Sequence, residues 1–152
     1  MTNIVNENIE YFLRTGELEN VRFGINRYEL KNLLGETDWI YPEQRNPSVY
    51  KYSHLEFHFD SEDNDAKLVG IMYVVVIEPA SNGNLSFQTH GWINGITKDQ
   101  AERMLDTLSI TYKSSVYEYD DDAWCIETQG KVSILFAKEK SVYSLEKLGV
   151  FI

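Results

Sequence analysis

Two histidines and a glutamate are the first residues in this chain whose types and spacing suggest chemistry. His54 and His58 lie four residues apart with Glu56 between them, and imidazole and carboxylate groups together can hold a metal ion. On a helix this spacing would bring the two imidazoles together, whereas on a strand it separates them by about 13 Å. The flanking residues alternate as in a strand. We therefore expect solvent-facing histidines and no metal site.

An acidic run and a single cysteine are the next candidates. The run from Asp60 to Asp65 has the composition of a calcium loop but lacks the glycine and the final glutamate that such loops need, so we expect a solvated turn. Cys125 is the only cysteine, which excludes an internal disulfide. Its alternation with Ala123 predicts a thiol in the core beside Ile134 and Phe136, where it would be unreactive.

The rest of the sequence has no glycine-rich phosphate loop, no nucleophile elbow and no cysteine–histidine cluster. Carboxylates are plentiful, but their spacing singles out no pair for acid–base catalysis. We therefore predict a protein that is not an enzyme, with no catalytic residues, no metal site and no cofactor.

Length and charge narrow the class of protein further. The 152 residues are enough for one ordinary domain. The chain has 24 acidic and 14 basic residues and a net charge of −10, which argues against nucleic-acid binding and favours a basic partner. No basic stretch followed by an apolar run begins the chain, and no apolar run approaches the ~20 residues of a membrane helix. We expect a cytoplasmic protein with no membrane partner.

The sequence contains an internal similarity, which indicates the helices and strands that position these residues. Residues 23–37 align without a gap with residues 94–108, with glycine, isoleucine and leucine at matching positions. Each stretch is followed by a strand-rich segment of similar layout. A separate helix is predicted ahead of both copies, over Ile4–Arg14, ended by Gly16.

Both copies begin with the signature of a helix start. Asn26 and Thr97 are N-cap residue types, and Glu29 and Gln100 follow them by three positions, as in a capping box. Apolar residues then recur at helical spacing. We predict two short amphipathic helices, of which the first ends at Gly35 and the second runs longer.

A hairpin is predicted after each helix. In the first hairpin the alternation breaks at Ser53-His54, which predicts a two-residue turn and places Lys51 opposite Glu56. In the second hairpin the turn is expected at Gln129-Gly130, because glycine can adopt a positive φ. The core side of each hairpin then faces the helices.

The predicted fold class is α+β, with two tandem helix-plus-antiparallel-hairpin repeats that share one sheet and helices packed on one face. We expect a single domain over residues 1–152. It comprises an N-terminal helix (1–17), a first repeat (18–78), a connector (79–90) and a second repeat (91–152).

The first copy resembles the repeat of the BamE/SmpA-type outer-membrane assembly lipoproteins. The matching residues are Gly24, Ile25, Glu29, Leu30, Leu33, Leu34 and Gly35. Two such units in tandem are similar to the β-lactamase inhibitory protein (BLIP-like) fold, whose two copies share a sheet with a concave binding face. The resemblance implies a binding scaffold rather than an enzyme. The chain lacks the lipid-attachment cysteine of the lipoproteins and the disulfides of the inhibitor, so location and partner do not carry over.

The helix-free face of the predicted sheet is the candidate binding surface. In the predicted register, the second hairpin turns Trp124, Ile126 and Leu135 away from the helices. Tyr73 and Trp39 are expected to flank them. Apolar and aromatic side chains on an open sheet face are typical of a partner site.

We therefore predict a non-enzymatic protein-binding or inhibitory module, such as an immunity-type protein that neutralises a toxin or an enzyme through the helix-free face. The partner would be another protein, and the acidic charge favours a basic one. Two alternatives stay open. One is a small-molecule-binding or hydrolytic domain with a pocket between the repeats, and the other is a structural homodimer packed through the apolar face.

Overall fold

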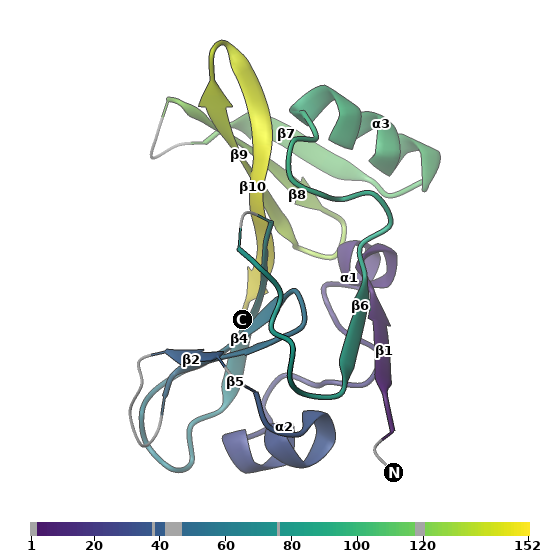
Figure 1. Ribbon diagram of the computed structural model, residues 1–152. Coiled ribbons are helices and arrows are strands. Elements are labelled where there is room, and N and C mark those ends of the chain that lie inside the picture. The colour runs from purple at the N-terminus through teal and green to yellow at the C-terminus, as the bar shows by residue number, and fades with distance from the viewer. Residues whose placement is uncertain (1–2, 38, 42–46, 76, 118–120) are drawn as a thin grey trace.

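The computed structural model describes residues 3–37, 39–41, 47–75, 77–117 and 121–152. These residues form three helices, an eight-stranded antiparallel sheet and a small parallel sheet of two strands (Figure 1). The strands are β1 (Val5–Asn8), β2 (Trp39–Tyr41), β3 (Val49–Tyr52), β4 (Leu55–Phe59), β5 (Leu68–Val74), β6 (Leu85–Gln88), β7 (Tyr112–Val116), β8 (Ala123–Thr128), β9 (Ser133–Glu139) and β10 (Val142–Phe151). The predicted α+β class is confirmed.

The two capped helices form where the sequence predicts them. Helices α2 (Arg27–Leu34) and α3 (Lys98–Thr107) both begin with a complete capping box, from Asn26 and Thr97 respectively. Gly35 caps the end of α2, and α3 is the longer of the two helices, as expected.

The N-terminal helix begins later than predicted. Helix α1 spans Ile9–Thr15 and ends at Gly16, which has a φ of 74°. The residues before it, Val5–Asn8, form strand β1 and pair in parallel with β6 from the connector. The prediction of a helix from Ile4 was therefore wrong at its start, because a distant partner holds this segment extended.

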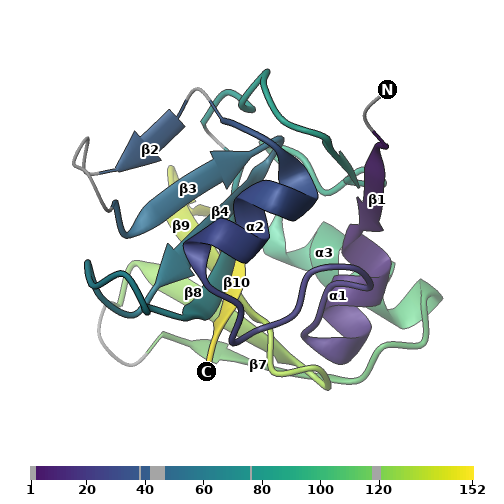
Figure 2. The same cartoon turned by 90° about the horizontal axis from the view of Figure 1, so that it is seen from below.

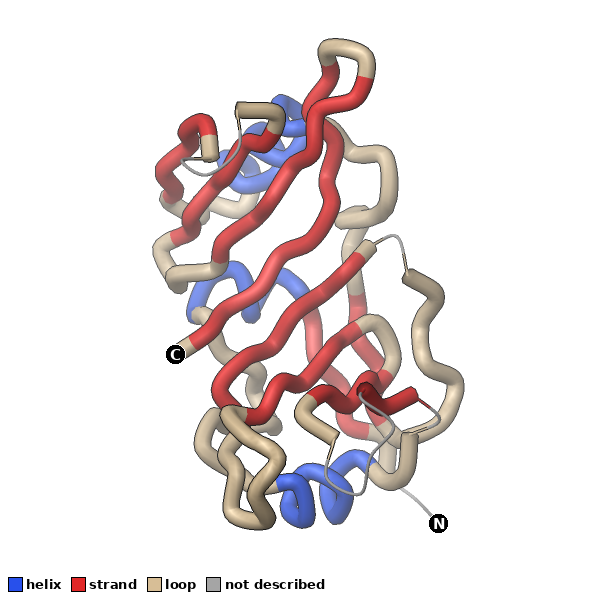
Figure 3. The backbone as a smooth tube through the Cα atoms, turned by 90° about the vertical axis from the view of Figure 1, so that its left-hand side faces the viewer, coloured by secondary structure: helices blue, strands red, loops and turns tan. Residues whose placement is uncertain are grey.

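The large sheet consists of two meanders joined edge to edge, in the order β2-β3-β4-β5-β10-β9-β8-β7. Strands β2 to β5 follow α2, and strands β7 to β10 follow α3. The join pairs β5 with β10 in antiparallel register. Helices α1, α2 and α3 all lie behind this sheet in Figure 3, which leaves the near face without helices. In Figure 2, α2 lies over the first meander with α1 beside it.

The first hairpin has the predicted register, and the second is shifted by one residue. Lys51 pairs with Glu56 across β3 and β4, and Ser53 in the two-residue turn has a φ of 53°. In the second hairpin the Thr128 N–H donates to the Val132 carbonyl, so the turn holds three residues instead of two. Lys131, and not Gly130, takes the positive φ, at 66°.

This shift reverses the two faces of β8 and leaves those of β9 as predicted. Ile126 pairs with Ile134, and Cys125 pairs with Leu135. Because side chains alternate with a period of two, a slip of one residue against β9 moves every side chain of β8 to the other face. The predicted orientations of β8 are consequently inverted.

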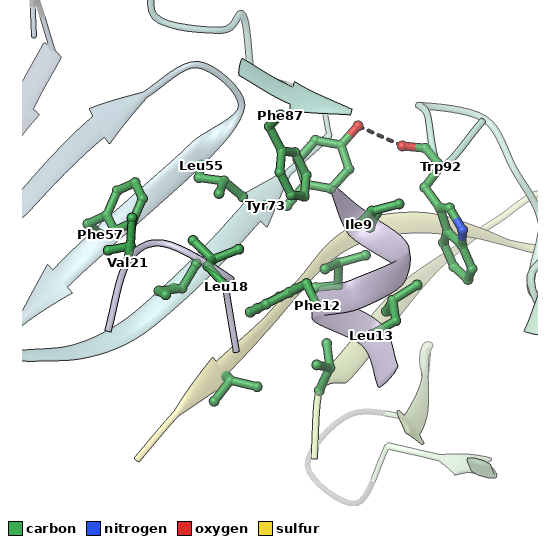
Figure 4. Packing of buried hydrophobic residues seen from close by; sticks show 14 of the residues in the cluster. Ile9, Phe12, Leu13, Leu18, Val21, Leu55, Phe57, Tyr73, Phe87 and Trp92 are labelled. Carbon is green, nitrogen blue, oxygen red and sulfur yellow. Dashed lines mark hydrogen bonds between the residues drawn. The ribbon is translucent and has the colours of Figure 1, made fainter. Parts of the chain in front are cut away.

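One buried hydrophobic cluster connects all three helices with both meanders. Figure 4 shows part of it, in which Phe12 and Leu13 of α1 lie between β5 and Trp92. Tyr73 on β5 donates a hydrogen bond of 2.6 Å to the Trp92 carbonyl, which ties the first meander to the loop before α3. The helices therefore cover the sheet with a continuous core.

Candidate functional site

Of the five residues predicted for a binding surface, the structure places two on the helix-free face. Leu135 on β9 is half-buried there and lies opposite Cys125. Trp39 on the edge strand β2 is also half-buried and pairs with Lys51. The two residues are on different meanders, so they do not form a single cluster.

The other three residues face the helices. Ile126 is fully buried in the core. Trp124 is half-buried, its indole Nε1 donates to Ser114 Oγ at 2.5 Å, and the Lys98 Nζ of α3 lies 4.7 Å from its ring centroid. The predicted outward orientation of Trp124 and Ile126 was wrong because of the three-residue turn. Tyr73 is buried as well and does not flank an open surface.

The helix-free face does contain a groove, at the join of the two meanders. Its volume is about 420 Å³. The apolar part of its lining is Met72, Cys125, Leu135, Leu148, Gly149 and Phe151, and the polar part is Tyr117, Glu127, Lys131, Ser133 and Lys147. We call this the sheet groove.

Small residues on the two joined strands make the sheet groove possible. Gly149 pairs with Met72, and a Cβ at Gly149 would lie 2.7 Å from the Ile71 carbonyl oxygen. Phe151 pairs with Gly70 and packs over it in the space that a side chain would fill. The residue is still 55% exposed, so Phe151 lines the sheet groove as an aromatic residue open to solvent.

Phe151 and Met72 were not among the binding residues predicted from the sequence. Both reach the sheet groove through the pairing of β5 with β10, which links segments that are distant in the sequence. A glycine opposite an aromatic residue was the available signal, but it cannot be recognised until the pairing is known.

The first meander carries charged groups on the same face, and these are buried. Lys51 is only 2% exposed and Glu56 only 8%. The Lys51 ammonium group donates to the Glu78 carbonyl and lies 6.0 Å from the Trp39 ring centroid. Burial lowers the pKa of Lys51, an effect that the charges of Glu56 and Glu78 oppose. The helix-free face of the first meander therefore carries charged side chains that are little exposed to solvent.

The two histidines are half-buried rather than solvent-facing. His58 Nε2 lies 3.0 Å from Glu56 Oε1, and the His58 ring meets Phe151 edge-on. His54 packs edge-on against Tyr73, and burial lowers its pKa. Within the described ranges, no group of three His, Cys, Asp or Glu side chains is placed to hold a metal ion.

Cys125 lies on the helix-free face and not beside Ile134 and Phe136, so its predicted place in the core was wrong. Burial raises the pKa of its thiol, and the charge of Glu127 adds to this effect. The thiol is therefore protonated at neutral pH and is a poor nucleophile. Among the residues that the structure describes, no helix is long and apolar enough to cross a membrane.

Comparison of the chain with protein-family models, with curated proteins and with solved structures finds no match. The resemblance to the BamE/SmpA repeat and to the BLIP-like fold stays a prediction. Any functional conclusion rests on the sheet groove and the residues around it.

Proposed function

We propose that this chain is a non-enzymatic protein-binding module, of inhibitory or immunity type, that holds its partner on the sheet groove. The observation that carries the proposal is the exposed aromatic residue Phe151 in the lining of a groove, part apolar and part polar, on a helix-free face. Protein interfaces commonly centre on an aromatic anchor next to a pocket, with polar groups at the rim.

The shape of the site favours a protein over a small ligand. Phe151 lines the sheet groove and is 55% exposed, so a small molecule in the groove would contact only part of the apolar surface that this residue exposes. A protein partner can cover the ring and fill the groove together. Covering both removes more apolar surface from water, which is the main favourable term in association.

The charge of the chain and the charge of the sheet groove differ. The chain has a net charge of −10, but the groove is lined by Lys131, Lys147 and Glu127. The acidic charge therefore acts over the wider surface, where it would speed the encounter with a basic partner. Contacts inside the groove would pair with groups of both signs.

We also propose that the two halves are tandem copies of one unit, similar to the BamE/SmpA repeat. In support, each half has a helix with a capping box followed by four antiparallel strands. A binding scaffold is what that resemblance implies.

The test begins with capture of partners from a lysate of the source organism and ends with calorimetry on the purified partner. Phe151→Ala should weaken binding by about 2 kcal/mol, or roughly 30-fold, if the ring is an anchor. Val142→Ala is the matched control, since Val142 is a similarly exposed apolar residue at the far end of the same strand. Added salt should weaken binding if the partner is basic.

Equal affinity of Phe151→Ala and the wild-type chain would remove the sheet groove from the interface. Light scattering of the chain alone addresses the homodimer alternative. A dimer that becomes monomeric in Phe151→Ala would mean that the groove serves self-association instead of a different protein.

A further inference from the structure

A second cavity lies on the helix-bearing side of the molecule, away from the sheet groove. It has a volume of about 580 Å³, is open to solvent, and is bordered by α1, α3 and the loop before α3. Its apolar lining is Trp92, Ile96, Met104 and Leu108, and Glu10 and Arg103 contribute charges of opposite sign. This volume is in the range of small-molecule sites, roughly 300–1,000 Å³. We call it the helix cavity.

Trp92 in this lining has an unsatisfied polar atom. The residue is fully buried, and its carbonyl accepts the hydrogen bond from Tyr73. Its indole Nε1, in contrast, is buried without a hydrogen-bond partner among the described residues. Figure 4 shows the nitrogen on the side of the ring turned away from Ile9 and Leu13. A buried donor without an acceptor is costly and uncommon in folded proteins, so it calls for an explanation.

We propose that the helix cavity binds a small apolar carbonyl compound whose oxygen accepts a hydrogen bond from Trp92 Nε1. The apolar lining would hold the hydrocarbon part, and the indole N–H would donate to the ligand oxygen. His90, Gln100 and Thr107 also line the cavity, at its polar part. Glu10 and Arg103 balance each other in charge, which favours a neutral ligand over an anion or a cation.

Met104 provides the movable part of the site. The methyl group of Met104 lies close to Gly91, where an added Cβ would be 3.7 Å from it. A methionine side chain has three rotatable bonds and changes conformation readily. Met104 and Trp92 line the same cavity, so rotation of Met104 away from Gly91 would change access to the Trp92 side chain with no movement of the helix backbone.

The test compares 1-tetralone with tetralin, two bicyclic molecules of similar shape of which only the ketone has an acceptor oxygen. The chain has three tryptophans, so a ¹⁵N-labelled sample gives three indole N–H signals. We expect 1-tetralone to shift the Trp92 indole signal downfield and to bind at least ten-fold more tightly than tetralin.

Two variants make the test specific. Trp92→Phe removes the donor and should abolish the preference for the ketone. Trp124→Phe is the control and should keep the preference, because the Trp124 indole already donates to Ser114. If Trp92→Phe does not fold, Thr107→Trp replaces it. Thr107 is exposed and lines the helix cavity, so the larger side chain should block both compounds.

Three results would overturn the proposal: no binding of either compound, equal affinity for both in the wild-type chain, or binding that Thr107→Trp leaves unchanged. None of these results bears on the sheet groove, which lies on the other face of the sheet.

Discussion

Replacement of Gly130 by alanine tests how tightly α1 packs against the second meander. A Cβ at Gly130 would lie 2.4 Å from the Gly16 nitrogen and 2.6 Å from the Thr15 carbonyl carbon. These are backbone atoms, so no side-chain rotation can relieve the overlap. A hydrogen bond of 2.6 Å from Thr128 Oγ1 to the Leu13 carbonyl holds α1 in place at the same point.

The expected cost follows from this geometry. Overpacking typically lowers the free energy of unfolding by about 1–3 kcal/mol, and contacts this short with fixed backbone place Gly130→Ala at the upper end. For a chain of this size, about 3 kcal/mol corresponds to a Tm lower by roughly 6–12 °C. Gly130 does not have a positive φ, so the loss would measure the contact itself and not backbone strain.

Urea unfolding followed by circular dichroism is the appropriate assay. Lys131→Gly in the same turn serves as the control, because Lys131 has a φ of 66° and glycine relieves that strain. We expect it to change the free energy of unfolding by less than about 1 kcal/mol. A loss below about 1 kcal/mol for Gly130→Ala would refute the close approach of α1 to this turn.

Two further predictions concern the register of the second hairpin and the buried lysine. Ile126→Ala should lower the free energy of unfolding by about 2–5 kcal/mol, because Ile126 is fully buried. Leu135→Ala on the opposite face should cost clearly less, and equal losses in urea unfolding would contradict the register. The stability of the wild-type chain relative to Lys51→Met should rise as pH approaches 10.5, because burial lowers the pKa of Lys51 and so disfavours its charged form in the folded chain. The unfolded chain holds this proton up to about pH 10.5, so the wild-type penalty is complete below the folded pKa and disappears as pH rises through this window. An advantage of Lys51→Met that grows with pH in urea unfolding would contradict the assignment.

Local patterns in the sequence were sufficient to predict the two capped helices and the first hairpin. The capping boxes that begin at Asn26 and Thr97 join residues only three positions apart, so a short stretch of sequence is enough to recognise them. The first hairpin was also predicted correctly, because the break in alternation at Ser53-His54 coincides with the observed turn.

The second hairpin shows how a small error in a turn removes a predicted site. A glycine at Gly130 favoured a two-residue turn, but this glycine is needed for the approach of α1 and not for its φ. Lys131 takes the left-handed conformation instead, and the extra residue buries Ile126. The sheet groove and strand β1 could not be predicted from the sequence for a different reason. Both depend on pairing between segments that are distant in the sequence.

The join between β5 and β10 determines the order in which the large sheet can assemble. All other neighbouring strands in this sheet are consecutive in the sequence, so their hairpins close over short loops and form rapidly. Pairing of Met72 with Gly149 requires closure of the connector and the second meander into one long loop, which slows folding. We expect each meander to form first and the join to close in the slowest step. The sheet groove lies on this join, so it appears only when folding is complete.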